Sequence, residues 1–398
     1  MKRSLFGYGK TTQALAKSGG WDIYDDSFTC KETDAYGNAL LPPSAFDPLQ
    51  SALELPSPGF PPTHPLVQKA LHVTSEYDYF FPHMPPCVWI TGTNGKTTTT
   101  QMIGHLLKEK GAVTGGNIGT PLAELSFDAP LWILETSSFT LHYTSKARPN
   151  VYVVLPIKPD HLSWHGSMEA YETAKLKPLE MMHEGSVAIL PKRYASLTTN
   201  AHLIPYENSQ DLAAFLGLEA ESLSIKEPFL MDALLALVVQ RVLFGTITPQ
   251  AFDTFVLDPH KLQELRDAQG RLWVNDTKGT NLDATIEALK RYQDKPIEII
   301  LGGDDKGVDL THLFETMQSL HVKIYAIGTN TQKLMDLAAT FGLVATPCHT
   351  LAHAVKAIDK SLSNKGVGLL SPAAASLDQF SSYVERGEMF MDLVRGLK

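Results

Sequence analysis

The sequence contains little cysteine and no excess of basic charge. Its three cysteines, Cys30, Cys87 and Cys348, lie far apart and form no C-x-x-C pair. Any disulfide scheme would leave one of them unpaired, a usage typical of a reducing cytoplasm. The formal net charge is −9, from 34 Lys and Arg against 43 Asp and Glu. A nucleic-acid-binding protein usually carries a basic excess, so no nucleic-acid partner is expected.

Long apolar runs are also missing. The longest, residues 233–244, is too short to cross a bilayer and contains Gln240 and Arg241. Residues 1–7 include basic side chains but do not lead into the apolar run of a signal peptide. We therefore expect a soluble, cytoplasmic protein without membrane contacts.

The 398 residues are enough for two or three domains, and two proline-containing breaks indicate where these meet. A Pro-Pro pair at 85–86 and a Leu-Asp-Pro step at 257–259 predict domains 1–82, 83–257 and 258–398. In the second and third, short apolar runs alternate with helix-length segments, which favours an α/β fold with parallel sheets. The strands expected there are 87–90, 131–134, 151–155, 187–190, 272–275, 297–301, 323–327 and 367–370.

The most informative motif is the glycine turn Thr91-Gly92-Thr93-Asn94-Gly95-Lys96-Thr97. It follows the expected strand 87–90 and precedes a run with helical spacing that reaches Gly111. Such a turn binds phosphate, because the first N–H groups of the helix point at the anion. Lys96 would add a positive charge, and the Thr97 hydroxyl would bind Mg²⁺. The loop is shorter than the common G-x-x-x-x-G-K-[ST], so a plain glycine turn with a surface lysine is the alternative.

A second glycine turn, Gly7-Tyr8-Gly9-Lys10-Thr11, lies near the N-terminus. Asp25 and Asp26 follow the next strand-like run, residues 21–24. By itself this pattern suggests a dinucleotide site, with the glycines at a pyrophosphate and an acid at a ribose. Thr12 replaces the third glycine of that pattern, so the motif leaves the ligand open.

Three ionisable residues follow the phosphate loop in the middle region. Glu135 comes at the carboxyl end of strand 131–134, where an acid beside a phosphate loop is placed to hold Mg²⁺. His161 follows strand 151–155 and is either a metal ligand or a loop histidine with ordinary partners. Lys175 lies in a helical pattern, and side-chain chemistry alone makes it a solvated lysine.

Residues 275–281 read N-D-T-K-G-T-N and follow strand 272–275. A helix N-cap would account for Asp276 but would place Lys278 unfavourably in a first helical turn.

Two further motifs follow later strands of the last region. Residues 301–306 form another glycine turn that ends in Lys306. Residues 370–380 leave the last strand, and a helix is expected to begin near Ser376 and Leu377. A helix N-terminus there would offer backbone donors to a negatively charged group.

These motifs, in this order, resemble those of the Mur ligase family, which builds the peptide stem of peptidoglycan. The resemblance covers nearly all 398 residues. It implies an α/β fold of three domains, with an N-terminal Rossmann-like UDP-binding domain, a central P-loop ATPase domain with a parallel sheet and a C-terminal Rossmann-like domain. It also implies that the N-terminal turn holds the UDP of a sugar substrate, together with an S-P-G turn at residues 57–59.

The resemblance changes the interpretation of Lys175, because the family carries a carbamylated lysine in an A-K motif shortly after a D-H pair. A buried lysine with a lowered pKa adds CO₂ as the free amine and becomes an anionic oxygen donor suited to Mg²⁺. For two Mg²⁺ ions, the ligands implied are Thr97, Glu135, His161 and Lys175 as its carbamate. The catalytic residues implied are Lys96, His161, Lys175 and Lys278.

The family pattern further assigns residues to each substrate. The residues implied for ATP are Thr93, Asn94, Gly95, Lys96, Thr97, Thr98, Lys261 and Asp276. Those implied for the UDP substrate are Gly7, Tyr8, Gly9, Lys10, Thr11, Asp25, Asp26, Ser57, Pro58, Gly59, Asn117 and His161. Those implied for the amino acid are Thr280, Lys306, Ser376, Leu377 and Tyr383.

Two departures from the family pattern stand out. Pro156 replaces an asparagine four residues before the Asp of the D-H pair. Phe229 and Asp232 stand where the family has asparagines against adenine, so those contacts cannot be transferred by identity.

The C-terminal motifs are most similar to those of the family's D-glutamate-adding members. The resemblance thus implies ATP-dependent joining of D-glutamate to UDP-N-acetylmuramoyl-L-alanine through an acyl phosphate, by a monomer. The alternatives are another Mur-type ligase, a folylpolyglutamate synthetase, or a non-enzymatic module that binds a nucleotide sugar or dinucleotide. A folylpolyglutamate synthetase is expected to lack the N-terminal turn with S-P-G, and a binding module has no need of Lys96, Glu135 and Lys278 together.

Overall fold

The computed structural model describes residues 2–117, 119–305 and 307–397, and these form three β-sheets with flanking helices. The chain divides into two compact units, residues 1–255 and 256–398. The strands of the three sheets are mostly parallel and are accompanied by helices, which confirms the predicted α/β class. The expected boundaries 82/83 and 257/258 remain predictions. Among the described residues, no helix is both long and apolar enough to cross a membrane.

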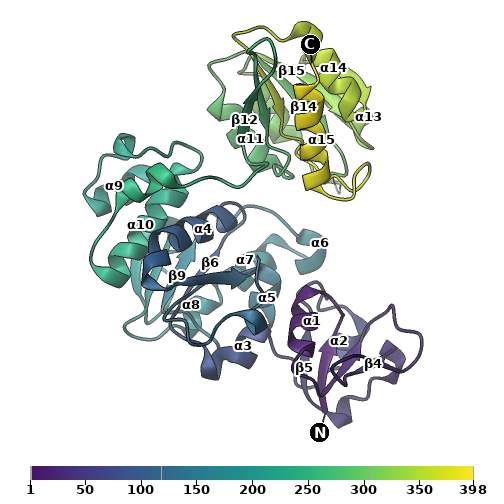
Figure 1. Cartoon of the computed structure of the whole chain (residues 1–398), viewed down its shortest axis with the longest axis vertical. Helices are drawn as coiled ribbons and strands as arrows, with labels where there is room; N and C mark the ends of the chain where they lie inside the picture. Colours follow the sequence, from purple (N-terminus) through teal and green to yellow (C-terminus); the bar gives the residue numbers. More distant parts are fainter. Residues whose placement is uncertain (1, 118, 306, 398) are drawn as a thin grey trace. The chain divides into compact units, whose positions relative to one another are not determined.

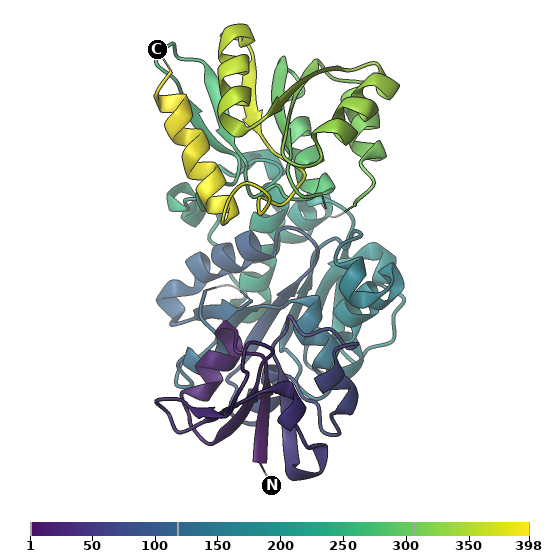
Figure 2. The same cartoon turned by 90° about the vertical axis from the view of Figure 1, so that its right-hand side faces the viewer.

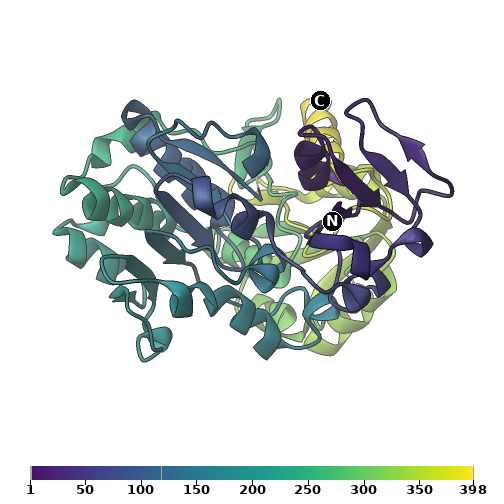
Figure 3. The same ribbon diagram turned by 90° about the horizontal axis from the view of Figure 1, so that it is seen from below.

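The N-terminal sheet of the first unit has the strand order β3-β4-β2-β1-β5, with only β3 antiparallel to its neighbour. Its strands are β1 (Lys2–Phe6), β2 (Trp21–Tyr24), β3 (Glu32–Thr33), β4 (Ala39–Leu41) and β5 (Ser51–Pro56). The helices of this part are α1 (Lys10–Ala16), α2 (Pro65–Lys69) and α3 (Glu76–Phe80). Figure 3 shows these purple strands from below, beside the N-terminus.

The middle sheet has the order β11-β10-β9-β6-β8-β7 and is parallel throughout. Its strands are β6 (Cys87–Thr91), β7 (Val113–Gly116), β8 (Trp132–Glu135), β9 (Val151–Val154), β10 (Val187–Pro191) and β11 (His202–Tyr206). Its helices are α4 (Lys96–Leu107), α5 (Ser138–Tyr143), α6 (Leu162–His165), α7 (Met168–Leu176), α8 (Pro178–Met181), α9 (Ser209–Leu216) and α10 (Leu230–Phe244). Helices α4 and α10 pack against each other, as Figure 1 shows.

The order of the middle strands explains where its polar motifs meet. Strands β6, β8 and β9 are buried along their whole length, as expected for parallel strands covered on both faces. Because β6 lies between β8 and β9, the loops that leave these three strands share one edge of the sheet. The Thr136 amide donates to Ile90, and the Leu155 amide donates to Thr91.

The second unit has the order β12-β13-β17-β14-β15-β16, with only β12 antiparallel. Its strands are β12 (Gln263–Arg266), β13 (Leu272–Asn275), β14 (Ile297–Gly302), β15 (Val322–Ile327), β16 (Val344–His349) and β17 (Val367–Leu370). Its helices are α11 (Leu282–Arg291), α12 (Thr311–Met317), α13 (Thr331–Phe341), α14 (Leu351–Ser361) and α15 (Tyr383–Arg395). Figure 2 shows the yellow helix α15 running beside this sheet.

The structure corrects two expectations about helix ends. Helix α4 ends at Leu107, and a 3₁₀ turn at 108–110 leads to Gly111, whose φ of 75° closes the element. No helix begins near Ser376, because α15 starts only at Tyr383, where the Ser382 side chain caps it.

In the middle and C-terminal sheets, the strands that sequence patterns missed lie at the sheet edges. They are β7, β11, β12 and β16. Strand β7 contains two glycines, and β11 and β16 each contain a proline. Glycine and proline weaken the strand pattern, but an edge strand tolerates a missing ladder bond.

Candidate functional site

The loop between β6 and α4 has the shape that phosphate binding requires. Gly92 and Gly95 adopt positive φ angles of 142° and 83°. A Cβ at Gly92 would lie 2.4 Å from the Leu155 Cβ, and one at Gly95 would lie 2.6 Å from Asp232 Oδ1. Only glycine fits both positions, so the loop can press its backbone N–H groups toward a ligand.

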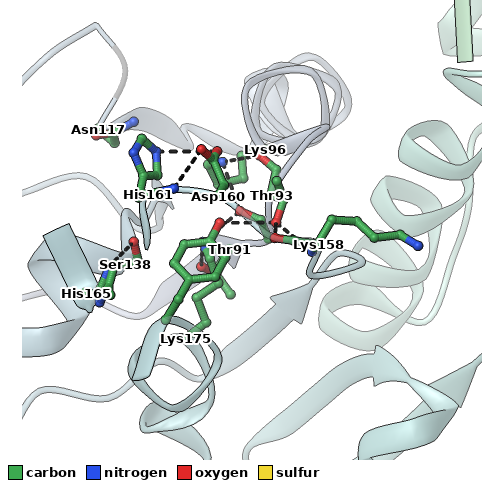
Figure 4. Close-up of polar contacts among 12 residues, drawn as sticks. Thr91, Thr93, Lys96, Asn117, Ser138, Lys158, Asp160, His161, His165 and Lys175 are labelled. Atoms are coloured by element: carbon green, nitrogen blue, oxygen red, sulfur yellow. Dashed lines mark hydrogen bonds and ion pairs between the residues drawn. The ribbon is translucent and has the colours of Figure 1, made fainter. Parts of the chain in front are cut away.

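Lys96 folds back over this loop. Its Nζ donates to the carbonyl oxygens of Gly92, at 2.9 Å, and Thr93, at 2.7 Å (Figure 4). The ammonium therefore lies where a phosphate cradled by the loop would meet it. Among the other residues predicted for ATP, Thr98 is buried in the first turn of α4, and Asn94 lies in the loop itself.

Glu135, at the end of β8, lies beside the start of α4. Its Oε2 accepts a hydrogen bond from Thr97 Oγ1 at 2.9 Å, and its Oε1 accepts one from Asn117 Nδ2 at 2.7 Å. The Glu135 side chain is almost completely buried. The structure thus brings together three residues that lie far apart in the sequence.

The donor set at Glu135 suits Mg²⁺. Adjacent ligands of an octahedral ion bound at ~2.1 Å lie about 3 Å apart, close to the separation of Thr97 Oγ1 and Glu135 Oε2. Within the described part of the chain, no group of three or more His, Cys, Asp or Glu side chains forms a metal cage.

Lys175, in α7, is buried rather than solvated, with 1% of the residue exposed. Its Nζ donates to the Gly92 carbonyl at 2.7 Å and lies 4.7 Å from the centre of the Tyr171 ring. Burial, followed by the nearby Lys96 charge, lowers the pKa of Lys175 well below its ordinary value. The lowered pKa favours the free amine, which is the form of a lysine that adds CO₂.

Tyr171 links Lys175 to the phosphate loop, a role that sequence patterns did not reveal. Its hydroxyl lies 3.1 Å from Thr93 Oγ1, which also donates to the Lys158 carbonyl at 2.9 Å. Tyr171 precedes Lys175 by one helical turn, so this spacing was the available signal.

His161 lies at the rim of the same site, in the left-handed conformation with φ of 52°. Its side chain is partly exposed, and its Nε2 lies 3.5 Å from Asp160 Oδ2. Its ring contacts Phe139 at 4.7 Å between centroids. Figure 4 shows His161 close to Asp160, with the Asn117 side chain nearby.

The N-terminal turn follows β1. The Tyr8 amide donates to Asp25 Oδ2 at 2.7 Å, and a Cβ at Gly7 would lie 2.5 Å from the Phe60 ring. Burial opposes ionisation of Asp25, but hydrogen bonds from the Ser27 hydroxyl and from the Ser27 and Tyr8 amides lower its pKa. Gly9 caps α1, which begins at Lys10 and continues through Thr11.

The neighbouring segments complete this edge of the N-terminal sheet. The Ser57 amide donates to the Phe6 carbonyl, which holds the S-P-G turn, with Pro58 and Gly59, beside the end of β1. Asp26 pairs with His64 at 3.3 Å. Lys10 Nζ donates to the Gly119 carbonyl, two residues beyond Asn117.

In the second unit, Asp276 follows β13 and is buried. Burial raises the pKa of Asp276 to about 7, although Ser371 Oγ donates to its Oδ2 at 2.7 Å. The Leu262 amide donates to Oδ1 at 3.2 Å, and the Lys261 charge acts on the same carboxyl. Lys278 Nζ lies 5.7 Å from the centre of the Tyr383 ring.

Of the residues predicted for the amino acid, Thr280 follows β13, Ser376 and Leu377 follow β17, and Tyr383 begins α15. Ser376 is buried, whereas Leu377 is 70% exposed. The Ser376 carbonyl accepts the amides of Gln379 and Phe380, which makes a turn in place of the expected helix. The Thr280 amide donates to the Lys278 carbonyl at 2.9 Å. Lys306 lies outside the described residues.

Arg386 is a buried residue whose position in the site was not predicted. Its guanidinium donates to Thr277 Oγ1 and to the carbonyls of Thr277 and Ala374. It thus holds the loop that carries Asp276 against the loop that carries Ser376.

Comparisons with known proteins agree with the motifs. Residues 90–221 match the family described as Mur ligase middle domain. A protein of Campylobacter jejuni subsp. jejuni serotype O:6 is 55% identical over 99% of both chains. One from Helicobacter pylori strain J99 is 45% identical over 99% of both chains. Both relatives carry the name UDP-N-acetylmuramoylalanine–D-glutamate ligase.

A solved structure of MurF ligase from Thermotoga maritima, in complex with ADP, shares the fold. Its TM-score is 0.58 at 15% sequence identity, over 99% of this chain and 95% of that one.

Proposed function

The chain belongs to the Mur ligase family, and we propose that it joins D-glutamate to UDP-N-acetylmuramoyl-L-alanine with conversion of ATP to ADP and phosphate. The family supplies the class of reaction. The names of relatives more than 40% identical over their full length support the choice of substrates. The reaction would belong to the cytoplasmic stage of peptidoglycan synthesis.

One observation of the site carries this proposal. The amines of Lys96 and Lys175 both donate to the Gly92 carbonyl, at 2.9 and 2.7 Å, at the sheet edge that also holds Glu135. A binding module for nucleotides needs the phosphate loop but has no use for a second, buried lysine behind it. A ligase that passes through an acyl phosphate needs both phosphate neutralisation and a fixed set of metal ligands.

The reaction requires no covalent bond between the enzyme and a substrate. The alanine carboxylate attacks the γ-phosphorus of ATP, and the bond to the β-phosphate oxygen breaks to release ADP. The D-glutamate amine then attacks the acyl carbon, loses a proton and displaces phosphate. Lys96 and Lys278 would neutralise the transferring group, while Asp276 would orient the nucleotide.

The metal would be held by residues that already lie together. Thr97 and Glu135 offer adjacent oxygen ligands, and His161 with a carbamate on Lys175 would complete a second site. Bound Mg²⁺ would supply charge neutralisation for phosphoryl transfer. Asn117 would hold the Glu135 carboxylate in place through its hydrogen bond.

The carbamate on Lys175 can be tested separately from the ligation. Activity in CO₂-depleted buffer should fall and should recover with bicarbonate, because the adduct forms from neutral amine and dissolved CO₂. Lys175→Ala should be nearly inactive, and a small carboxylic acid should restore part of its activity by replacing the lost ligand. An active, substrate-bound crystal with a bare amine at Lys175 would contradict the carbamate.

An ADP-release assay with UDP-N-acetylmuramoyl-L-alanine and one amino acid at a time tests the function itself. D-Glutamate should support turnover, and the product should contain one glutamyl residue by mass. Turnover with meso-diaminopimelate or L-lysine at a comparable rate would make the enzyme a different member of the family. Nucleotide binding without any ligation would favour a binding module.

A further inference from the structure

A continuous aromatic strip runs from the S-P-G turn to the metal-side histidine. Trp164 contacts Phe139 with 4.7 Å between ring centroids, and Phe139 contacts His161 at the same separation. Helix α6 begins directly after His161, so His161 and Trp164, three residues apart, share one face of this short helix.

The other end of the strip is tied to the N-terminal part of the same unit. Trp164 Nε1 donates to the Gly59 carbonyl at 3.3 Å. Tyr143, whose ring contacts Trp164, donates its hydroxyl to the Phe60 carbonyl at 2.7 Å. The indole N–H therefore fixes the orientation of the ring, while part of the Trp164 side chain stays exposed.

The proposed substrate must span this same stretch. Its UDP would lie at the turns 7–11 and 57–59, and its alanine carboxylate must reach the site of Lys96, Glu135 and His161. The uncharged sugar lies between these two ends. The C–H face of a pyranose is apolar and suits an aromatic surface whose polar edge is already satisfied.

We propose that Trp164 is the platform on which the sugar ring of the UDP-linked substrate lies, and that it sets affinity for that substrate. This inference rests on the proposed function for the identity of the sugar. Trp164 would act in binding alone, because its ring is separated from His161 by Phe139 and its N–H is engaged by Gly59.

Intrinsic fluorescence offers a direct test, because Trp164 is partly exposed, unlike the other four tryptophans. The other four, Trp21, Trp89, Trp132 and Trp273, are at most 1% exposed. Titration with UDP-N-acetylmuramoyl-L-alanine, without ATP or amino acid, should change the emission of the full-length protein. UDP alone should leave the emission unchanged, and the change caused by UDP-N-acetylmuramoyl-L-alanine should be absent in Trp164→Phe.

The same titration separates the two proposals. Calorimetry that detects binding of UDP-N-acetylmuramoyl-L-alanine without any change in emission would overturn the platform and leave the ligase assignment intact. Absence of binding would instead overturn the assignment on which the platform rests.

Kinetics distinguish a platform from a brace, meaning a structural role in which the Trp164 N–H only holds the N-terminal and middle parts of the unit together. Trp164→Ala should raise the KM for the UDP substrate about three- to tenfold, with kcat and the KM values for ATP and D-glutamate little changed. Trp164→Phe should recover most of that loss, because it keeps a ring but removes the donor to Gly59. Tyr143→Phe is the matched control, because it removes only the neighbouring donor to Phe60.

If Trp164 is only a brace, the KM values of these variants should follow a different pattern. If Trp164→Phe is as impaired as Trp164→Ala, or if Tyr143→Phe shows the same rise in KM, the N–H and not the ring matters, and the platform is wrong.

Discussion

At the scale of single residues, burial changes the chemistry of side chains that look ordinary in the sequence. Burial lowers the pKa of Lys175 well below its ordinary value, and Lys96 lies over the phosphate loop because Gly92 and Thr93 present their carbonyls to it. Both lysines are proposed to act on phosphate or metal ions and not through packing, so their substitution should affect activity more than stability.

Lys96→Ala should abolish ligation and leave the fold intact. Loss of a cation directed at phosphate in the transition state should lower the rate by ~10²–10³-fold or more. Lys192→Ala, at an exposed lysine of the same unit, is the control and should keep the wild-type rate. Turnover near the wild-type rate in folded Lys96→Ala would remove the phosphate-loop assignment.

Glu76 should make the stability of the protein depend on pH. Burial raises the pKa of this carboxyl to about 8, and its Oε2 has no hydrogen-bond partner among the described residues. The folded state therefore binds more protons than the unfolded state between the ordinary pKa of a glutamate and about 8. The free energy of unfolding should fall as pH rises through that window.

Glu76→Gln removes the titrating group while keeping its shape. The free energy of unfolding of Glu76→Gln, relative to that of the wild type, should increase between about pH 5 and pH 8. The increase should be at most about 1.4 kcal/mol for each unit by which folding raises the pKa of Glu76. Denaturant melts at several pH values measure this, with Glu184→Gln at an exposed glutamate as control. A constant difference across the range would show that Glu76 is ionised in the folded protein.

At the scale of elements, the parallel order β9-β6-β8 creates the site. The three strands deliver the phosphate loop, Glu135 and the segment before His161 to one edge, although up to about 70 residues separate them in the chain. The loop requires glycine at positions 92 and 95, because Leu155 and Asp232 leave no space for a Cβ there.

Gly92→Ala should therefore distort the loop. The added Cβ would meet the Leu155 Cβ at 2.4 Å, at a φ of 142° that only glycine adopts readily. We expect loss of ATP binding and a lower melting temperature. Gly185→Ala is the matched control, because its φ is also positive but nothing lies within 4 Å of its Cβ. Equal effects of the two substitutions would show that backbone strain alone, without the clash, explains the loss.

At the scale of the whole molecule, the candidate residues for one reaction are divided between two compact units. The phosphate loop and the N-terminal turn belong to the first. The loops of Asp276, Lys278 and Ser376 belong to the second. Recognition of the amino acid should therefore be separable by mutation from recognition of the nucleotide at the phosphate loop.

Lys306→Ala should raise the KM for D-glutamate and change ATP binding little, because the lysine is predicted to bind a substrate carboxylate. Wild-type enzyme should prefer D-glutamate strongly over L-glutamate and D-aspartate, since the other isomer misdirects the amine or one carboxylate. Rates with each amino acid, and nucleotide affinity by calorimetry, measure both effects. A parallel loss of ATP affinity in Lys306→Ala would contradict the separation.

The sequence by itself determined the features that depend on local chemistry. Glycines, a lysine and a threonine in fixed order predicted the loop Thr91–Thr97 between a strand and a helix, and the structure has β6 and α4 there. Alternating apolar runs predicted the parallel sheets, and the order of motifs identified the family, which the comparisons confirm. Such signals lie within a few residues of one another, so no long-range contact is needed to read them.

Only the tertiary structure decided what depends on packing between distant segments. The pattern around Lys175 is that of a solvated helix, and the lysine is buried because α7 packs behind the β6 loop. The expected helix at Ser376 is replaced by a turn, while Arg386, from α15, holds the adjacent carbonyls. Trp164 reaches Gly59 across 105 residues. Burial and partnership of this kind arise from contacts that no local pattern encodes, because the two sides of each contact come from different parts of the chain.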